Sequence, residues 1–300
     1  MNEAPNTSSS SCRNTLITFL SLAVGLSALL FGGIAYHRNR LASAQQEIAR
    51  EEADAKTKTV IAAQNLEQYI SKHYLQVQEM AASPFLSDRQ LWSAWSIERQ
   101  KEYFQNNFLA NSDGMDSYVV INAKTGDTVF SGGTGTKTKN NKNLDYYQQV
   151  VKFKKPVIIP RRKSTKTGIS YIYMAAPSFD EGGNLSFVTR TRIRFDEVQS
   201  EIAAIFDNLN SVVGNSEKSL NFFLVDGIGR IIAAENPEII ERHINELYPV
   251  AELLRQKDVS SVEVDKGIND SAYILAHTPI VEKRGLPELD WSLMTVTKID

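Results

Sequence analysis

Three arginines occupy alternate positions of one strand-like segment. Arg190, Arg192 and Arg194 lie within Leu185–Phe195, separated by threonine and isoleucine. Because successive side chains of a strand point to opposite faces, the three guanidinium groups are predicted to share one face. A planar guanidinium pairs well with carboxylate or phosphate groups. The spacing therefore predicts a site for a small anion.

The segment before these arginines is strongly basic and rich in tyrosine. From Lys137 to Lys166 there are ten Lys and Arg residues against one acid, Asp145. Aromatic walls for a small-molecule pocket are available from Tyr146, Tyr147, Tyr171 and Tyr173. The alternative is that the arginines line a solvated face, or contact a dimer partner or the envelope surface.

Catalytic and metal-binding patterns are missing from the sequence. The four histidines are scattered, no Gly-x-Ser-x-Gly nucleophile motif occurs, and the single cysteine, Cys12, lies near the amino terminus. We expect no enzymatic activity, no metal and no cofactor. The net charge of −2 excludes a generally basic protein that coats nucleic acid.

One long apolar stretch precedes all of these residues. Thr15–Tyr36 holds 22 residues without a charge, about 33 Å as a helix, which is enough to cross a bilayer core. We predict a disordered tail over 1–14 and a retained transmembrane helix over 15–37. A cleaved signal peptide is the alternative, but its apolar region is normally shorter. Arg38, Arg40 and Arg50 after the span favour a cytoplasmic location for the rest of the chain, although long domains translocate largely regardless of charge.

The next segment, 38–82, is predicted to form a stalk helix. Leu41–Ala82 contains no proline or glycine, and its apolar residues recur at steps of three, four or seven. Ser83-Pro84 is expected to end it. An apolar stripe on so long a helix predicts a parallel homodimer, with Ile48 and Leu66 facing the partner helix.

After a predicted helix over Asp88–Leu109, the hydrophobic period changes to two. One pattern of strand, strand, helix and three strands occurs twice. Its first copy covers 117–122, 128–131, 143–153, 156–161, 169–176 and 185–195. After a helix over Phe195–Leu209, the second covers 221–225, 230–234, 237–256, 261–265, 272–280 and 291–298. The fold class is α+β, with two antiparallel-sheet modules.

This order resembles the double Cache family of bacterial extracytoplasmic sensors. The resemblance covers about residues 38–300. The residues that carry it are Asp145–Val150 (DYYQQV), Thr167-Gly168, Met174–Gly183 (MAAPSFDEGG), Phe223–Ala233 (FLVDGIGRIIA) and Trp291-Ser292-Leu293. The family implies a transmembrane-plus-stalk helix, a membrane-distal PAS-like module over 83–200 and a proximal one over 201–300. It also implies a sensor domain outside the cytoplasm of a cell with a plasma (inner) membrane.

The site departs from the members of the family that bind amino acids. Leu144 stands where their carboxylate-binding arginine belongs, while Arg162 and Arg192 stand at or near the amine-holding positions. A cation at those positions would repel an ammonium group. The resemblance and the charges together predict that the distal module binds a small anion. The predicted ligand-binding residues are Tyr146, Tyr147, Arg162, Tyr171, Tyr173, Asp180, Arg190 and Arg192.

These features predict the ligand-sensing part of a transmembrane signal-transduction receptor, of the methyl-accepting chemotaxis type. The sensor of a histidine kinase of a two-component system, or of a cyclase, would have the same features. The alternative of a different class is a membrane-tethered scaffold whose PAS-like modules bind another protein.

Overall fold

The computed structural model describes residues 9–110, 112, 114–134, 138–164, 168–213, 220–248, 261–266, 272–281, 285–287 and 289–299. Side chains are described from Phe31 onward, apart from those of residues 89, 210, 212–213, 220, 261–266 and 299. The chain divides into two compact units, 1–53 and 54–300. The first consists of the beginning of helix α1 (Ser9–Ala81). Residues 1–8 of the predicted tail lie outside the described residues, and α1 includes the rest of it. The second unit holds all the other elements.

Most of the predicted membrane span is described by its backbone alone. Residues 15–30 are part of helix α1, but their side chains are not described. Within the part of the chain whose side chains are described, no helix is both long and apolar enough to cross a bilayer.

The second unit contains two five-stranded antiparallel sheets, which confirms the predicted α+β class. The distal sheet has the order β2-β1-β5-β4-β3 and the proximal sheet the order β7-β6-β10-β9-β8. The distal strands are β1 (Met115–Asn122), β2 (Thr128–Gly133), β3 (Val157–Lys163), β4 (Ser170–Phe179) and β5 (Leu185–Arg194). The proximal strands are β6 (Leu220–Asp226), β7 (Ile231–Ala234), β8 (Ser261–Lys266), β9 (Ala272–Pro279) and β10 (Trp291–Ile299). Each of these strands was predicted from the two-residue period.

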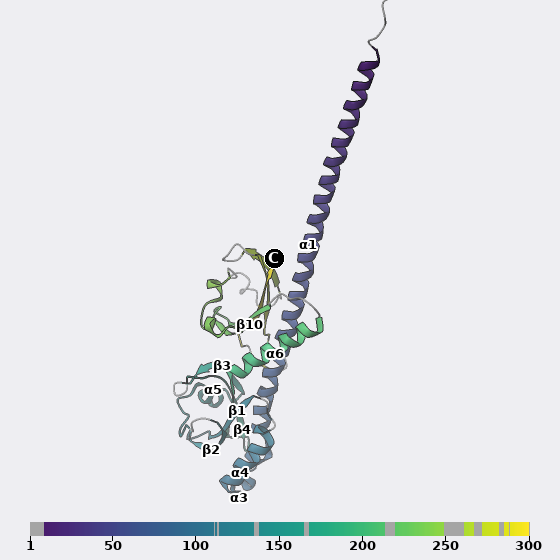
Figure 1. The fold of residues 1–300 in the computed structure, drawn as a ribbon. Helices are drawn as coiled ribbons and strands as arrows, with labels where there is room; N and C mark the ends of the chain where they lie inside the picture. Colours follow the sequence, from purple (N-terminus) through teal and green to yellow (C-terminus); the bar gives the residue numbers. More distant parts are fainter. Residues whose placement is uncertain are drawn as a thin grey trace, which may run out of the picture. The chain divides into compact units, whose positions relative to one another are not determined.

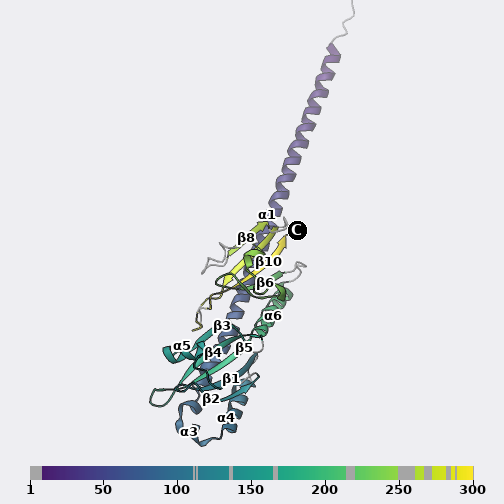
Figure 2. The same ribbon diagram turned by 90° about the vertical axis from the view of Figure 1, so that its left-hand side faces the viewer.

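Two helices cover one face of the sheets. Helix α6 (Phe195–Val213) crosses α1 at an angle in Figure 1 and lies beside it in Figure 2. A single apolar core joins α1, α6 and both sheets, and it includes Leu66, Ile70, Ile193, Ile202 and Leu224. Because Leu66 is fully buried within its own chain, the prediction that it faces a partner helix is wrong. A homodimer contact through the part of α1 before Ala55 stays a prediction.

The opposite face of the distal sheet is covered by helix α5 (Asp145–Phe153). Tyr146, Tyr147 and Val150 of α5 pack against Val119, Ala175 and other apolar residues of β1, β4 and β5. The predicted alternation holds, because Ile172, Met174 and Ile193 lie in the core with α1 instead. The distal sheet is therefore packed on both faces, and Arg190 and Arg192, which point toward α5, are buried.

The predicted helix over Asp88–Leu109 is broken. Its parts are α3 (Arg89–Ala94), α4 (Ile97–Phe104) and a π-helical turn (Gln105–Leu109), and they follow the single turn α2 (Pro84–Ser87). Asp88 caps α3 and Ser96 caps α4 with side-chain oxygens. The Gln100 amide donates to the carbonyl oxygens of Trp92 and Trp95, at 3.0 Å each. These bonds satisfy carbonyls that the break would leave unpaired.

The predicted helix over 237–256 is wrong for the residues that the structure describes there. Only two 3₁₀ turns form before residue 249, Pro237–Ile239 and Ile244–Glu246. The side chains of Asn236 and His243 bond the first backbone N–H groups of these turns, and such local bonds compete with a longer helix. Between the turns, Glu241 has a φ of 78°, which an α-helix cannot contain. Residues 249–260 lie outside the described part of the chain.

Candidate ligand-binding site of the distal module

Six of the predicted site residues meet on the α5-facing side of the distal sheet. Strand pairing sets Tyr173 opposite Arg192 and Ala175 opposite Arg190. The ring of Tyr146, on α5, stacks on that of Tyr173 with centroids 5.8 Å apart, and Tyr171 lies 5.9 Å from Tyr173. The two-residue period predicted this grouping, and α5 completes it.

Arg190 is the most deeply enclosed charge of this cluster. Its side chain lies under Tyr146 and Tyr173, with Cζ 5.9 Å and 5.5 Å from their ring centroids. Nη1 donates to Ser117 Oγ at 3.0 Å, whereas Nε is buried without an acceptor. Among the described residues, no carboxylate forms an ion pair with Arg190. Burial lowers the pKa of this guanidinium and raises the pKa of the Tyr146 hydroxyl.

Arg192, in contrast, already has an anionic partner within the chain. Its Nη2 lies 2.7 Å from Asp116 Oδ2, and both side chains are at most 10% exposed. The same nitrogen donates to the carbonyl oxygen of Thr134 at 2.7 Å, and Cζ lies 4.1 Å from the centroid of Tyr171. Asp116 reaches this place because a register shift between Met115 and Ser117 interrupts the pairing of β1 with β5.

Arg162 is paired as well, but in contact with solvent. Its Nη1 lies 2.9 Å from Asp145 Oδ2, and the two side chains are 39% and 58% exposed. A register shift between Ile159 and Arg162 in the pairing of β3 with β4 sets Arg162 opposite Tyr171. Without that shift, alternation would place Arg161 on this face instead.

Two predicted site residues make their contacts elsewhere. The hydroxyl of Tyr147 donates to the carbonyl oxygen of Ala123 at 2.8 Å, so Tyr147 fixes α5 to the end of β1. Asp180 lies in the turn between β4 and β5, where its Oδ1 accepts from the backbone N–H of Asn184 at 2.8 Å. Leu144, at the position of the family's arginine, is the residue that precedes α5 and has an extended backbone.

The charges of the cluster do not balance. Three guanidinium groups, of Arg162, Arg190 and Arg192, face two carboxylates, of Asp116 and Asp145. The remaining positive charge is buried at Arg190, and a buried charge without a partner is costly. One carboxylate of a ligand would both balance the charge and fill the open hydrogen-bonding position at Nε.

Three residues of the site, Asp116, Ser117 and Thr134, were not predicted from the sequence. Asp116 and Ser117 could have been found from the pairing of β1 beside β5, had that pairing been known, because Ser117 lies opposite Arg192. No comparable signal indicated the carbonyl of Thr134. Among the described residues, no group of three His, Cys, Asp or Glu side chains could hold a metal ion.

The comparisons with known proteins agree with the fold. No protein-family model and no curated protein matches the chain. Among solved structures, it is similar to the ligand-binding domain of the Pseudomonas aeruginosa amino-acid chemoreceptor PctC in complex with GABA. The identity is 15% and the TM-score 0.61, over 82% of this chain and 99% of that one.

Two further structures give the same result. The ligand-binding domain of the Pseudomonas fluorescens chemoreceptor CtaA in complex with L-alanine is 14% identical, with a TM-score of 0.57 over 83% of this chain and 97% of that one. A methyl-accepting chemotaxis protein is 13% identical, with a TM-score of 0.61 over 85% of this chain and 99% of its own. The chain thus has the fold of chemoreceptor ligand-binding domains, as the double Cache resemblance implies.

Proposed function

We propose that this chain is the extracytoplasmic ligand-sensing region of a transmembrane receptor, of the methyl-accepting chemotaxis type, and that its distal module binds a small molecule with a carboxylate group. The observation that carries the ligand class is the buried guanidinium of Arg190, which has no ion-pair partner among the described residues. Tyr146 and Tyr173 enclose it, as the walls of a small-molecule site would.

Arg190, and not Arg162 or Arg192 as expected from the sequence, is the residue that holds the ligand carboxylate in this proposal. Arg162 and Arg192 were expected to be the charge partners, but Asp145 and Asp116 already neutralise them. The related receptors bind GABA and L-alanine, which carry an ammonium group as well as a carboxylate. The two carboxylates that could accept an ammonium here are engaged with arginine, so an organic acid without an amine fits this charge arrangement best.

Replacing Arg190 by methionine is expected to weaken binding of the carboxylate ligand about 10- to 150-fold, since a charge-assisted contact contributes about 1.5–3 kcal/mol. Without ligand, the same change should leave thermal stability unchanged or raise it, because it removes a buried charge that has no partner. The measurement is a thermal-shift screen of the full chain against carboxylates, amino acids and amines, followed by calorimetry on the compounds that stabilise it.

Arg162→Met is the matched control, because it removes an exposed arginine of the same cluster and should change affinity much less. The proposed ligand class is wrong if a cationic amine is what stabilises the protein. It is also wrong if Arg190→Met leaves the affinity for a stabilising carboxylate unchanged.

The membrane topology is part of the same proposal. The uncharged stretch Thr15–Tyr36 supports one membrane crossing, and the fold shared with chemoreceptor ligand-binding domains supports placing the residues after Arg40 outside the cytoplasm. In a bacterial host, an alkaline phosphatase fusion at Asp300 should be active and a fusion to a reporter that works only in the cytoplasm inactive. The opposite pair of activities would contradict this topology.

A further inference from the structure

A polar cleft lies at the junction of the two sheet modules. It has a volume of about 700 Å³, which is within the range of small-molecule sites. One wall comes from the distal module and includes Arg161, Lys163 and Ser170, while the facing wall comes from the proximal module and includes Arg230 and Glu241. Ile232, Leu289 and Trp291 add apolar surface. Neither the sequence patterns nor the proposed distal site accounts for it.

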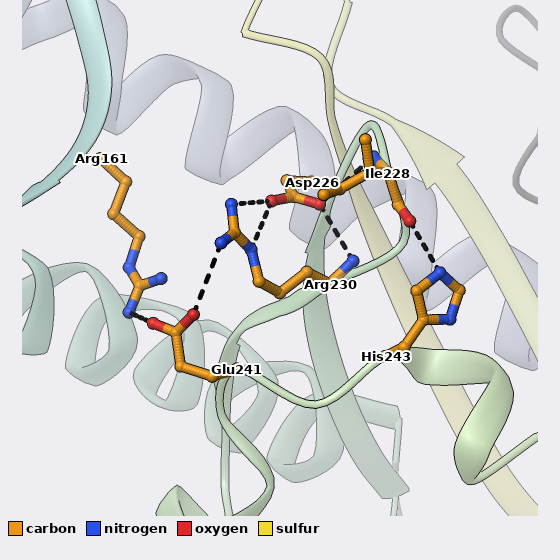
Figure 3. Close-up of polar contacts among 6 residues, drawn as sticks. All are labelled: Arg161, Asp226, Ile228, Arg230, Glu241 and His243. Carbon is orange, nitrogen blue, oxygen red and sulfur yellow. Dashed lines mark hydrogen bonds and ion pairs between the residues drawn. The ribbon is translucent and has the colours of Figure 1, made fainter.

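Glu241 bridges two guanidinium groups in this cleft (Figure 3). Its Oε1 lies 2.5 Å from Arg161 Nη2, on the distal wall, and its Oε2 lies 3.7 Å from Arg230 Nη1, on the proximal wall. The Glu241 side chain is 52% exposed, and its backbone has a φ of 78°, which is unfavourable for a residue other than glycine. A half-exposed carboxylate therefore occupies a position that two cations make suitable for an anion.

The other groups of the cleft are not equally available. Asp226 Oδ2 lies 2.9 Å from both Nε and Nη2 of Arg230. Asp226 Oδ1 accepts hydrogen bonds from two backbone N–H groups of the β6–β7 turn. His243 holds the same turn: its Nδ1 accepts from Asn245, so Nε2 carries the proton that it donates to the carbonyl oxygen of Ile228 (Figure 3). The turn and the Arg230–Asp226 pair thus form a fixed proximal wall.

Arg161 retains an unused donor. Its Nε is buried without an acceptor, and Cζ lies 5.3 Å from the ring centroid of Phe195, which holds the guanidinium in place. Apart from Glu241, the charged residues that line the cleft are three cations, Arg161, Lys163 and Arg230, and two acids, Asp226 and Asp290. Without the Glu241 carboxylate the lining therefore carries a net charge of +1. The distal wall then offers hydrogen-bond donors to an incoming acid.

We infer that this cleft is a second binding site, for a small molecule with two carboxylate groups, and that the side chain of Glu241 competes with the ligand for it. One ligand carboxylate takes the place of Glu241 between Arg161 and Arg230, and the other lies toward Lys163. Because the ligand contacts both walls, its binding links the distal and proximal modules. The site is separate from the distal cluster and does not depend on the function proposed for it.

Glu241→Gln is expected to increase the affinity for succinate about tenfold, because the tethered competitor loses its charge. Adding Arg161→Gln should remove that gain. Glu238→Gln is the matched control, because this substitution removes the same charge from the same segment. Glu238 is exposed and does not line the cleft. The measurement is calorimetry of the full chain with succinate, with acetate and inorganic phosphate as comparison ligands.

The inference is overturned if Glu241→Gln and Glu238→Gln change succinate affinity equally, or if the gain survives Arg161→Gln. A gain for phosphate or acetate that equals the gain for succinate would overturn the dicarboxylate class. In the Arg190→Met background, where the distal site has lost its charge partner, Glu241→Gln should still raise the affinity for succinate about tenfold, so failure of the distal proposal and failure of this one give different results.

Discussion

Asp116→Asn is expected to lower the free energy of unfolding by about 3–5 kcal/mol, because it leaves the guanidinium of Arg192 buried without its counter-charge. The Arg192 and Asp116 side chains are only 10% and 5% exposed, and Arg192 Nη2 lies 2.7 Å from Asp116 Oδ2. Water therefore cannot replace the lost carboxylate. Urea unfolding of the full chain, followed by far-UV circular dichroism, gives the change in stability.

Asp145→Asn provides a matched control within the same module. It makes the same chemical change in the ion pair with Arg162, whose Nη1 lies 2.9 Å from Asp145 Oδ2. The side chains of Arg162 and Asp145 are, however, 39% and 58% exposed. Exposed pairs contribute about 0–1 kcal/mol, so this variant should unfold almost like the unaltered chain. Equal effects of the two substitutions would show that the burial of Asp116 and Arg192 does not determine their energy.

Acidification is expected to destabilise the proximal module through His277. This side chain is 1% exposed, and neither ring nitrogen has a hydrogen-bond partner among the described residues. Burial lowers its pKa from 6.5 to about 4. The folded state therefore holds the neutral ring, while the unfolded state takes up a proton below about pH 6.5. Stability is complete above that pH and falls as the pH decreases toward 4, by up to about 3 kcal/mol.

Other groups also titrate in this range, so the test is the difference between the chain and His277→Leu. Strand pairing sets His277 opposite Met294, and by alternation it shares a face with Leu275 in the proximal core. Leucine should therefore be tolerated. Between about pH 7.5 and pH 5 the unaltered chain should lose about 2 kcal/mol more than the variant. Equal losses would mean that the imidazole is not kept neutral by folding.

Local patterns were enough to predict most of the elements. The strands of both modules and helix α5 follow from hydrophobic period and turn residues, which act over a few positions. The shared face of Arg190 and Arg192 follows from the same two-residue period, because alternation is a property of every strand. The first helix ends at Ala81, one residue before the predicted Ala82, and Ser83-Pro84 is the signal that predicted this end.

The two incorrect helix predictions have a common cause. Over 88–109 apolar spacing suggested a continuous helix, and over 237–256 one was predicted although Pro249 lies inside that range. The chain instead satisfies its backbone groups through the side chains of Ser96, Gln100, Asn236 and His243. Such bonds depend on side-chain geometry that a hydrophobic period does not contain.

The composition of the candidate sites was decided by tertiary structure. Strand alternation and composition alone place arginines and tyrosines on one sheet face and make the charge there positive. The pairing of β1 with β5, and the register shifts near Asp116 and Arg161, decided which arginines are neutralised, which one is left for a ligand, and which side chain turns to the inter-module cleft. Register between strands that are distant in sequence depends on the whole packed core, since a shift of one residue reverses every face. No local pattern in the chain carries that information.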